Sequence, residues 1–116
     1  MGKNILVVED DKQMQRLYAR VLGGEGYRLT LADCAVDGCC LLENGSYDLV
    51  ITDFRLGDGT GEEVMEAARG TKTMLVTGAM EKPELEALSL RYGLTAFFKK
   101  PFRLEELLSK IREALG

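Results

Sequence analysis

Five short apolar runs, each followed by a segment with helical spacing, constrain this fold more than any other feature. The sequence predicts strands at residues 4–9, 27–31, 48–53, 73–77 and 95–99, and helices at residues 11–22, 35–44, 62–69, 83–92 and 104–115. The last helix carries its apolar stripe at Leu104, Leu107, Leu108, Ile111 and Leu115. Strands that alternate with helices favour an α/β fold with an open parallel sheet and helices on both faces.

The pattern inside each strand predicts its place in the sheet. The runs at 4–9, 48–53 and 73–77 are apolar nearly throughout, which is typical of central parallel strands that are covered on both faces. The run at 27–31 instead alternates apolar and polar residues, so we expect an edge strand there.

Composition narrows the class of protein. A chain of 116 residues predicts one domain, residues 1–116, and a net charge of −4 with interleaved acids and bases argues against nucleic-acid binding. No apolar run approaches the ~20 residues of a membrane span, and nothing at the start resembles a signal peptide, so we expect a cytoplasmic protein.

The three cysteines lack CxxC spacing and predict free thiols. The absence of histidine argues against a zinc site, and any histidine chemistry must come from a partner.

Polar residues stand where four of the predicted strands end. Glu9 and Asp10 follow the first strand, Asp53 ends the third, Thr77 ends the fourth and Lys100 follows the fifth. Ligands of open parallel sheets bind at the carboxyl ends of the strands. Clustered carboxylates repel one another, which a hard divalent cation would relieve, and a lysine would balance an incoming anion.

Simpler interpretations compete at several of these positions. Asp10 could cap the following helix, and Thr77 could be an ordinary strand residue. Lys99 is the alternative to Lys100, but alternation places it on the other side of the strand. The glycine-rich loop at 57–61 lacks the Lys-Ser/Thr of a phosphate-binding P-loop.

With these motifs in order, the chain resembles a response-regulator receiver domain of two-component signalling. The matching segments are ILVVEDD at 5–11, DLVITD at 48–53, MLVTG at 74–78 and FKKPF at 98–102. The resemblance covers essentially the whole chain. It implies a CheY-like, flavodoxin-like (βα)5 domain with a doubly wound parallel sheet of strand order 2-1-3-4-5.

The resemblance also implies a set of metal ligands. Asp53 would be the phosphoacceptor and a ligand of Mg²⁺. Asp10 would bind the ion directly, Glu9 through water, and Arg55 through its backbone carbonyl. In the family, the Arg55 position faces the mouth of the site, so its side chain is expected to lengthen the life of the phosphoryl group.

Three further residues have implied roles around the phosphoryl group. Thr77 would hydrogen-bond to it, and Lys100 would pair with Asp53 and then with the phosphoryl oxygens. Phe97 would change rotamer together with Thr77, and the Lys100–Pro101 bond would be cis. The response would appear on the face formed by the helix at 83–92, the strand at 95–99 and the helix at 104–115.

The implied partner is a histidine kinase or a histidine phosphotransfer domain, and self-association through the responding face is a further expectation. The chain would not be an enzyme beyond catalysing its own aspartyl phosphorylation and dephosphorylation.

Tyr18 lies off the predicted core stripe of Met14, Leu17 and Val21, so we expect it, with Phe102, to be an exposed docking residue. Whether the chain acts alone or belongs to a hybrid kinase or larger regulator stays open.

Two departures from the family pattern stand near the acceptor. Gly57 replaces a proline that many receivers carry, which predicts a looser loop. The stretch from Asp53 to Thr77 is short, which predicts that either the helix at 62–69 or the loop after it is trimmed. Three other functions are less consistent with the sequence. A flavodoxin-like cofactor binder needs a phosphate loop where this chain has acids, and an aspartate-nucleophile phosphatase needs an acid at Arg55. A degenerate receiver would lack one of the acids, the threonine or the lysine.

Overall fold

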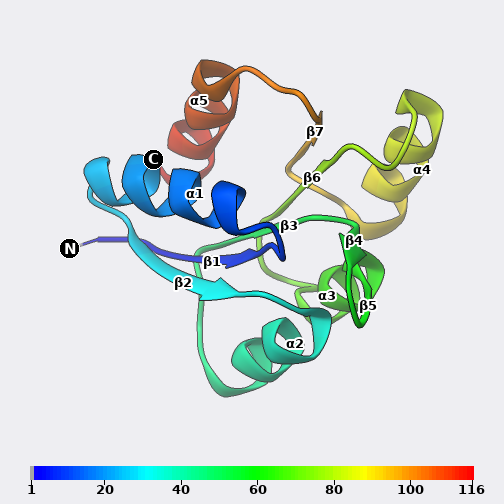
Figure 1. Cartoon of the computed structure of the whole chain (residues 1–116), viewed down its shortest axis with the longest axis horizontal. Helices are drawn as coiled ribbons and strands as arrows, with labels where there is room; N and C mark the ends of the chain where they lie inside the picture. Colours follow the sequence, from blue (N-terminus) through cyan, green and yellow to red (C-terminus); the bar gives the residue numbers. More distant parts are fainter. Residues whose placement is uncertain (1) are drawn as a thin grey trace.

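The computed structural model describes residues 2–116, and Met1 lies outside them. Strands and helices alternate as predicted, apart from a small hairpin after the third strand (Figure 1). In chain order the elements are β1 (Asn4–Val8), α1 (Lys12–Gly24), β2 (Arg28–Ala32), α2 (Ala35–Asn44), β3 (Leu49–Thr52), β4 (Arg55–Leu56), β5 (Gly59–Thr60), α3 (Gly61–Ala67), β6 (Thr73–Thr77), α4 (Lys82–Tyr92), β7 (Ala96–Lys99) and α5 (Leu104–Leu115).

Five strands form one parallel sheet in the order β2-β1-β3-β6-β7. Because β6 and β7 are the fourth and fifth strands that the sequence predicts, this confirms the order 2-1-3-4-5. The burial pattern follows the position in the sheet, since β3 and β6 are buried along their whole length whereas β2 is partly exposed. The edge-strand prediction for β2 is therefore confirmed.

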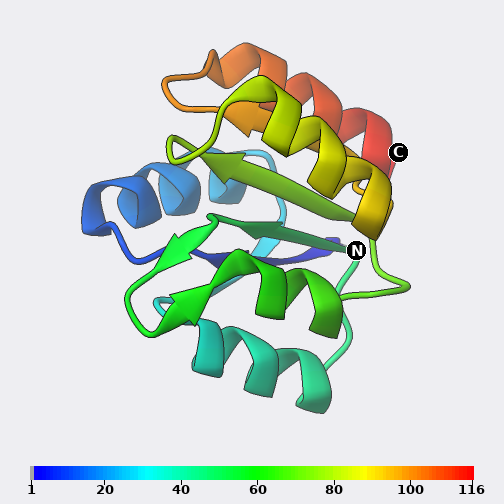
Figure 2. The same ribbon diagram turned by 90° about the vertical axis from the view of Figure 1, so that its right-hand side faces the viewer.

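Helices cover both faces of this sheet (Figures 1 and 2). Alternate residues of each strand face opposite sides, so each strand contributes to two separate cores. Ile5 and Val7 of β1 pack with α1 and α5, while Leu6 and Val8 pack with α2 and α3. Leu75 of β6 packs with α3 and α4 in a third cluster. Among residues 2–116, no helix combines the length and apolar composition that a membrane span requires.

The structure corrects the prediction for α1. Tyr18 is only 3% exposed and lies in the core between α1, α5 and the sheet, so the expectation of an exposed docking residue is wrong. Tyr18 and Leu22 are the buried residues of this helix, four positions apart on one face, with Met14 one turn before them. Leu17 lies at the margin of that face and is only partly buried.

The second difference is an antiparallel hairpin, β4–β5, within the segment predicted as a loop. It ends at Gly61, which begins α3 and donates its backbone N–H to the Phe54 carbonyl at 2.6 Å. A Cβ at Gly61 would stand 2.2 Å from the Asp53 carbonyl oxygen, so only glycine permits this close approach. The hairpin therefore starts and ends against the residue that closes β3. The helix that follows, α3, spans 7 residues and is close to the short helix that the sequence predicts at 62–69.

Candidate functional site

Three carboxylates meet at the carboxyl end of the central strands. Glu9 and Asp10 follow β1, Asp53 follows β3, and one carboxylate oxygen of each lies within 4.8 Å of the others. Glu9 is buried, Asp53 is partly buried and Asp10 is exposed. Since β1 and β3 are adjacent parallel strands, the sheet itself brings these acids together.

Lys100 lies between two of these carboxylates. Its Nζ is 2.7 Å from Asp53 Oδ2 and 3.0 Å from Glu9 Oε1. The pairing with Asp53 was expected, whereas the second pairing, with Glu9, was not. Lys99 points elsewhere and contacts the Met80 carbonyl and Glu81 in the loop before α4, as strand alternation predicts.

Burial and charge act on these groups in opposite directions. Burial raises the pKa of Glu9, although its bonds to the Asp11 amide and Lys100 partly offset the effect. Burial alone would lower the pKa of Lys100, but the bonds with Asp53 and Glu9 outweigh it and the pKa is raised. Lys100 is therefore held in its charged form, and the buried Glu9 depends on this cation for compensation.

Backbone amides occupy the other oxygens of the two paired acids. Asp53 Oδ1 accepts from the Phe54 N–H at 2.6 Å and, more weakly, from the Arg55 N–H at 3.4 Å. Glu9 Oε2 accepts from the Asp11 N–H at 3.0 Å. These bonds orient the carboxylates of Glu9 and Asp53. Asp10 takes no part in them, and its side chain lies exposed at the surface, where it could bind a cation.

Two neighbours of the site form contacts that the sequence analysis did not predict. Asp11, not Asp10, caps α1, because its side chain accepts from the Gln13 N–H at 3.0 Å. The alternative interpretation of Asp10 as the helix cap is therefore wrong. Gln15 donates from Nε2 to the Glu9 carbonyl at 2.6 Å, which ties α1 to the acidic cluster. An acid directly before an amphipathic run signals the cap, but nothing local signals the contact of Gln15.

Thr77 ends β6 and Phe97 lies in β7, and neither is a member of the carboxylate cluster. Thr77 is fully buried and its Oγ1 accepts from the Ala79 N–H at 3.2 Å. Its backbone carbonyl accepts from the Lys100 N–H at 2.9 Å, so the two residues are linked through the main chain. Phe97 is partly buried against the cluster of β6, α3 and α4 residues. Thr77 therefore bonds to the lysine that pairs with Asp53, whereas Phe97 packs toward α3 and α4.

Arg55 is the first residue of β4, two positions after Asp53, and its side chain is exposed. Its backbone is held in register opposite Thr60 by the hairpin. The Lys100–Pro101 peptide bond is cis, as expected.

The cluster of Glu9, Asp10 and Asp53 fits a small divalent cation. The atoms that these residues offer to a metal are all carboxylate oxygens. Because Asp10 is exposed, a cation bound there would also contact solvent, which suits an ion that retains several waters. Carboxylates select hard ions such as Mg²⁺ over the softer metals that prefer thiolate or imidazole.

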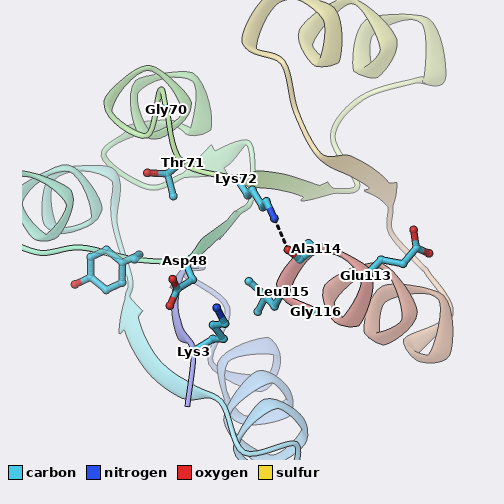
Figure 3. Close-up of a pocket in the computed structure, with 10 residues that line it drawn as sticks. Lys3, Asp48, Gly70, Thr71, Lys72, Glu113, Ala114, Leu115 and Gly116 are labelled. Atoms are coloured by element: carbon cyan, nitrogen blue, oxygen red, sulfur yellow. Dashed lines mark hydrogen bonds between the residues drawn. The ribbon is translucent and has the colours of Figure 1, made fainter. Parts of the chain in front are cut away.

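Cavities lie at both ends of the sheet. One of about 300 Å³ adjoins the acidic cluster and is lined by Asp11, Met14, Leu17, Lys100, Pro101, Phe102 and Leu104. Another, of about 540 Å³, lies at the amino ends of the strands, where Lys72 donates to the Ala114 carbonyl at the end of α5 (Figure 3). That second cavity contains none of the predicted site residues. The cavity relevant to the cluster is therefore the one beside α1.

Comparison with known proteins points to one family. The family model described as the response regulator receiver domain matches residues 5–112. The uncharacterized transcriptional regulatory protein YkoG of Bacillus subtilis (strain 168) is 34% identical over 116 residues, which cover 97% of this chain and 50% of YkoG. The transcriptional regulatory protein CusR of Escherichia coli (strain K12) is 32% identical over 115 residues, covering 96% of this chain and 50% of CusR. The chain thus spans about half the length of the curated relatives that it matches.

Solved structures agree. A CheY-like response regulator receiver domain protein from Methanospirillum hungatei JF-1 superposes with a TM-score of 0.90 at 34% identity, covering 99% of this chain and 94% of that one. The receiver domain of the sensor histidine kinase PA1611 from Pseudomonas aeruginosa PAO1 has a TM-score of 0.85 at 25% identity, covering 100% of this chain and 99% of that one. That structure has a magnesium ion coordinated in its active-site cleft.

Proposed function

The chain belongs to the family of response regulator receiver domains of two-component systems, and we propose that it is a phosphoacceptor switch in which Asp53 receives a phosphoryl group from a partner's phosphohistidine. The observation that carries this proposal is the contact of Lys100 Nζ with both Asp53 and Glu9, beside an exposed Asp10. We infer that the receiver domain comprises residues 1–116 and that the protein acts in the cytoplasm.

The reaction follows from the position of Asp53. A carboxylate oxygen of Asp53 attacks the phosphorus of the phosphohistidine, the P–N bond breaks, and the imidazole leaves. Lys100 keeps Asp53 ionised beforehand, because an adjacent cation favours the charged form. Afterwards Lys100 pairs with the new phosphoryl oxygens. Phosphoryl transfer depends chiefly on positioning and on neutralising charge, which this arrangement supplies.

Mg²⁺ is the proposed cofactor. Asp10 and Asp53 would hold it through carboxylate oxygens, Glu9 through water, and Arg55 through its backbone carbonyl. The bound ion would neutralise charge on the transferred group. The exposed Arg55 side chain would lean over the site mouth and slow the loss of the phosphoryl group. The magnesium ion in the PA1611 receiver domain supports this assignment by similarity.

Incubation with acetyl phosphate tests the function directly. Wild-type protein with Mg²⁺ should gain the mass of one phosphoryl group in a base-labile adduct, and it should gain far less in EDTA. Asp53→Asn should gain none, whereas Asp48→Asn, which removes an acid at the opposite end of the sheet, should load like wild type. Equal loading of wild type and Asp53→Asn would refute the assignment of the acceptor.

The response would pass through Thr77 and Phe97 to α4, β7 and α5. Thr77 would form a hydrogen bond to the phosphoryl group, and Phe97 would change its packing against α4. This face already carries apolar surface, since Leu90 is 88% exposed beside a cavity of about 290 Å³ that Phe97 also lines. We propose that self-association, if phosphorylation induces it, uses this face.

The phosphodonor would be a histidine kinase or histidine phosphotransfer domain that docks beside α1. With Tyr18 buried, the candidates for docking are Met14, Leu17 and Phe102, which line the cavity next to Lys100. The double variant Leu17→Ala, Phe102→Ala should slow transfer from a protein donor while loading from acetyl phosphate stays normal. An equal loss with both donors would place the defect in the site and not in docking.

A further inference from the structure

The β4–β5 hairpin is too small to hold its own position. Each of its strands has two residues, and the turn between them is Gly57-Asp58. Two-residue hairpin turns that match the twist of their strands need a positive φ, and neither Gly57 nor Asp58 has one. Isolated two-stranded hairpins are at best marginally stable in water. Contacts with the rest of the molecule must therefore fix the hairpin.

The tip of the hairpin is bound to the start of α2. Asp58 Oδ1 accepts from the Ala35 N–H at 2.8 Å, and its Oδ2 accepts from the Val36 N–H at 3.0 Å. The same two amides lower the pKa of Asp58, so the carboxylate is charged when it makes these bonds. Figure 1 shows the hairpin next to the first turn of α2, as these distances require.

The start of α2 has no strong cap of its own. Its N-cap residue is Cys34, whose sulfur accepts from the Asp37 N–H at 3.5 Å. Cysteine is not among the residues favoured at this position, and its thiol is a weak acceptor. Asp58 thus provides the carboxylate that helix N-termini attract, from 23 residues away in sequence.

The base of the same hairpin lies in the proposed metal and phosphoryl site. The Phe54 and Arg55 amides both point at Asp53 Oδ1, and Arg55 begins β4. A shift of the hairpin would therefore displace the Arg55 carbonyl and the amides that orient Asp53. Gly57 stands where many receivers have proline, so the turn itself adds no rigidity here.

From this geometry we propose that Asp58 is a positioning residue. By tying the hairpin tip to the first turn of α2, it holds the Arg55 carbonyl where it would bind Mg²⁺ and keeps the Phe54 and Arg55 amides in place against Asp53. This inference rests on the proposed function, because it concerns the same metal and the same acceptor.

The test compares Asp58→Ala and Asp58→Asn with wild type. Asp37→Asn serves as the matched control, since it removes an equal charge from the first turn of α2 without touching the Ala35 and Val36 amides. For each protein, Mg²⁺ is titrated by NMR at the Asp10 amide, and the rate of acetyl phosphate loading is measured against Mg²⁺ concentration. Hydrogen exchange at Ala35 and Val36 reports the cap directly.

We expect Asp58→Ala to weaken Mg²⁺ binding by about tenfold, at the lower end of the range for residues that orient a metal ligand. The loading rate at saturating Mg²⁺ should recover to within about twofold of wild type, because the ion then restores the position of the carbonyl. Asp58→Asn should fall in between, since it keeps one acceptor oxygen, and Asp37→Asn should bind Mg²⁺ like wild type.

Two results would overturn the inference. One is faster exchange at Ala35 and Val36 with unchanged Mg²⁺ affinity, which would make Asp58 a helix cap only. The other is an equal loss of affinity in Asp37→Asn, which would assign the effect to charge alone. Failure of wild-type protein to bind Mg²⁺ or to load would instead refute the proposed function, so the two failures are distinguishable.

Discussion

At the scale of single residues, Lys100 holds the site together. Its side chain is 23% exposed, whereas those of Glu9 and Asp53 are 2% and 11% exposed, so it compensates two poorly solvated acids. Removing one member of a buried ion pair leaves the remaining charge uncompensated. The resulting loss of stability is larger than the net contribution of the pair to the free energy of unfolding.

We therefore expect Lys100→Ala to lower the free energy of unfolding in EDTA by about 1–3 kcal/mol, less than for a fully buried pair because of partial solvation. Mg²⁺ should reduce this loss by replacing the missing cation. Lys99→Ala, which removes a neighbouring lysine from an exposed ion pair, should cost less than about 1 kcal/mol. Urea unfolding of the three proteins measures both differences, and equal losses for the two variants would contradict the role of Lys100.

The bonds of Asp58 to the Ala35 and Val36 amides predict a pH dependence of stability. Because its pKa is lowered in the folded protein, its contribution to stability is present above the usual value of 3.8 and is lost as pH falls through the lower folded value. The amide chemical shifts of Ala35 and Val36 should therefore titrate with a midpoint below 3.8. In Asp58→Asn this titration should disappear. A midpoint at or above 3.8 would contradict the observed bonds.

At the scale of elements, a polar contact links α3 to α4. The Tyr92 hydroxyl donates to Glu62 Oε2 at 2.8 Å, and the Arg69 guanidinium lies 4.9 Å from the centre of the Tyr92 ring. Arg91 also approaches Glu62, at 3.5 Å. This cluster joins the end of α4 to α3, the helix that follows the β4–β5 hairpin.

Tyr92→Phe removes the hydrogen bond but keeps the ring, so we expect a loss of about 0.5–1 kcal/mol at this partly exposed position. A double-mutant cycle with Glu62→Gln isolates the pair, since Glu62→Gln alone also weakens the contact with Arg91. Urea unfolding of the four proteins gives the coupling energy. A coupling near zero would mean that the contact between the two helices contributes nothing to stability.

At the scale of the whole molecule, the sheet concentrates negative charge at one end. Glu9, Asp10 and Asp53 follow adjacent strands, and Lys100 bonds with only two of them. A cation that binds the folded protein and not the unfolded chain raises stability in proportion to the logarithm of its concentration.

A free Mg²⁺ concentration of ten times the dissociation constant should thus raise the free energy of unfolding by about 1.4 kcal/mol. Asp10→Asn should lose most of this increment, because it removes the exposed ligand of the cluster. Asp48→Asn, at the opposite end of the sheet, should keep it. Thermal unfolding with and without Mg²⁺ measures all three increments, and a full increment in Asp10→Asn would show that the ion binds elsewhere.

The sheet and the place where polar groups gather could be predicted from the residues, and the strand order could be predicted from the family resemblance. It could do so because apolar runs of this length become buried strands, and because the carboxyl ends of parallel strands share one edge. Asp53 and Lys100 were predicted from that rule to lie together, and they do. The roles of these residues in phosphorylation stay predictions until the experiments above are done.

Packing between elements set which of two neighbouring helix residues faces the core and which distant groups form hydrogen bonds. Tyr18 and Leu17 are adjacent in sequence, and the packing of α1 against α5 and the sheet buried the tyrosine. The bonds of Lys100 to Glu9 and of Asp58 to the start of α2 span 91 and 23 residues. Local spacing sets periodicity within one element, whereas contacts of that range form only when separate elements pack, so no local pattern could have predicted them.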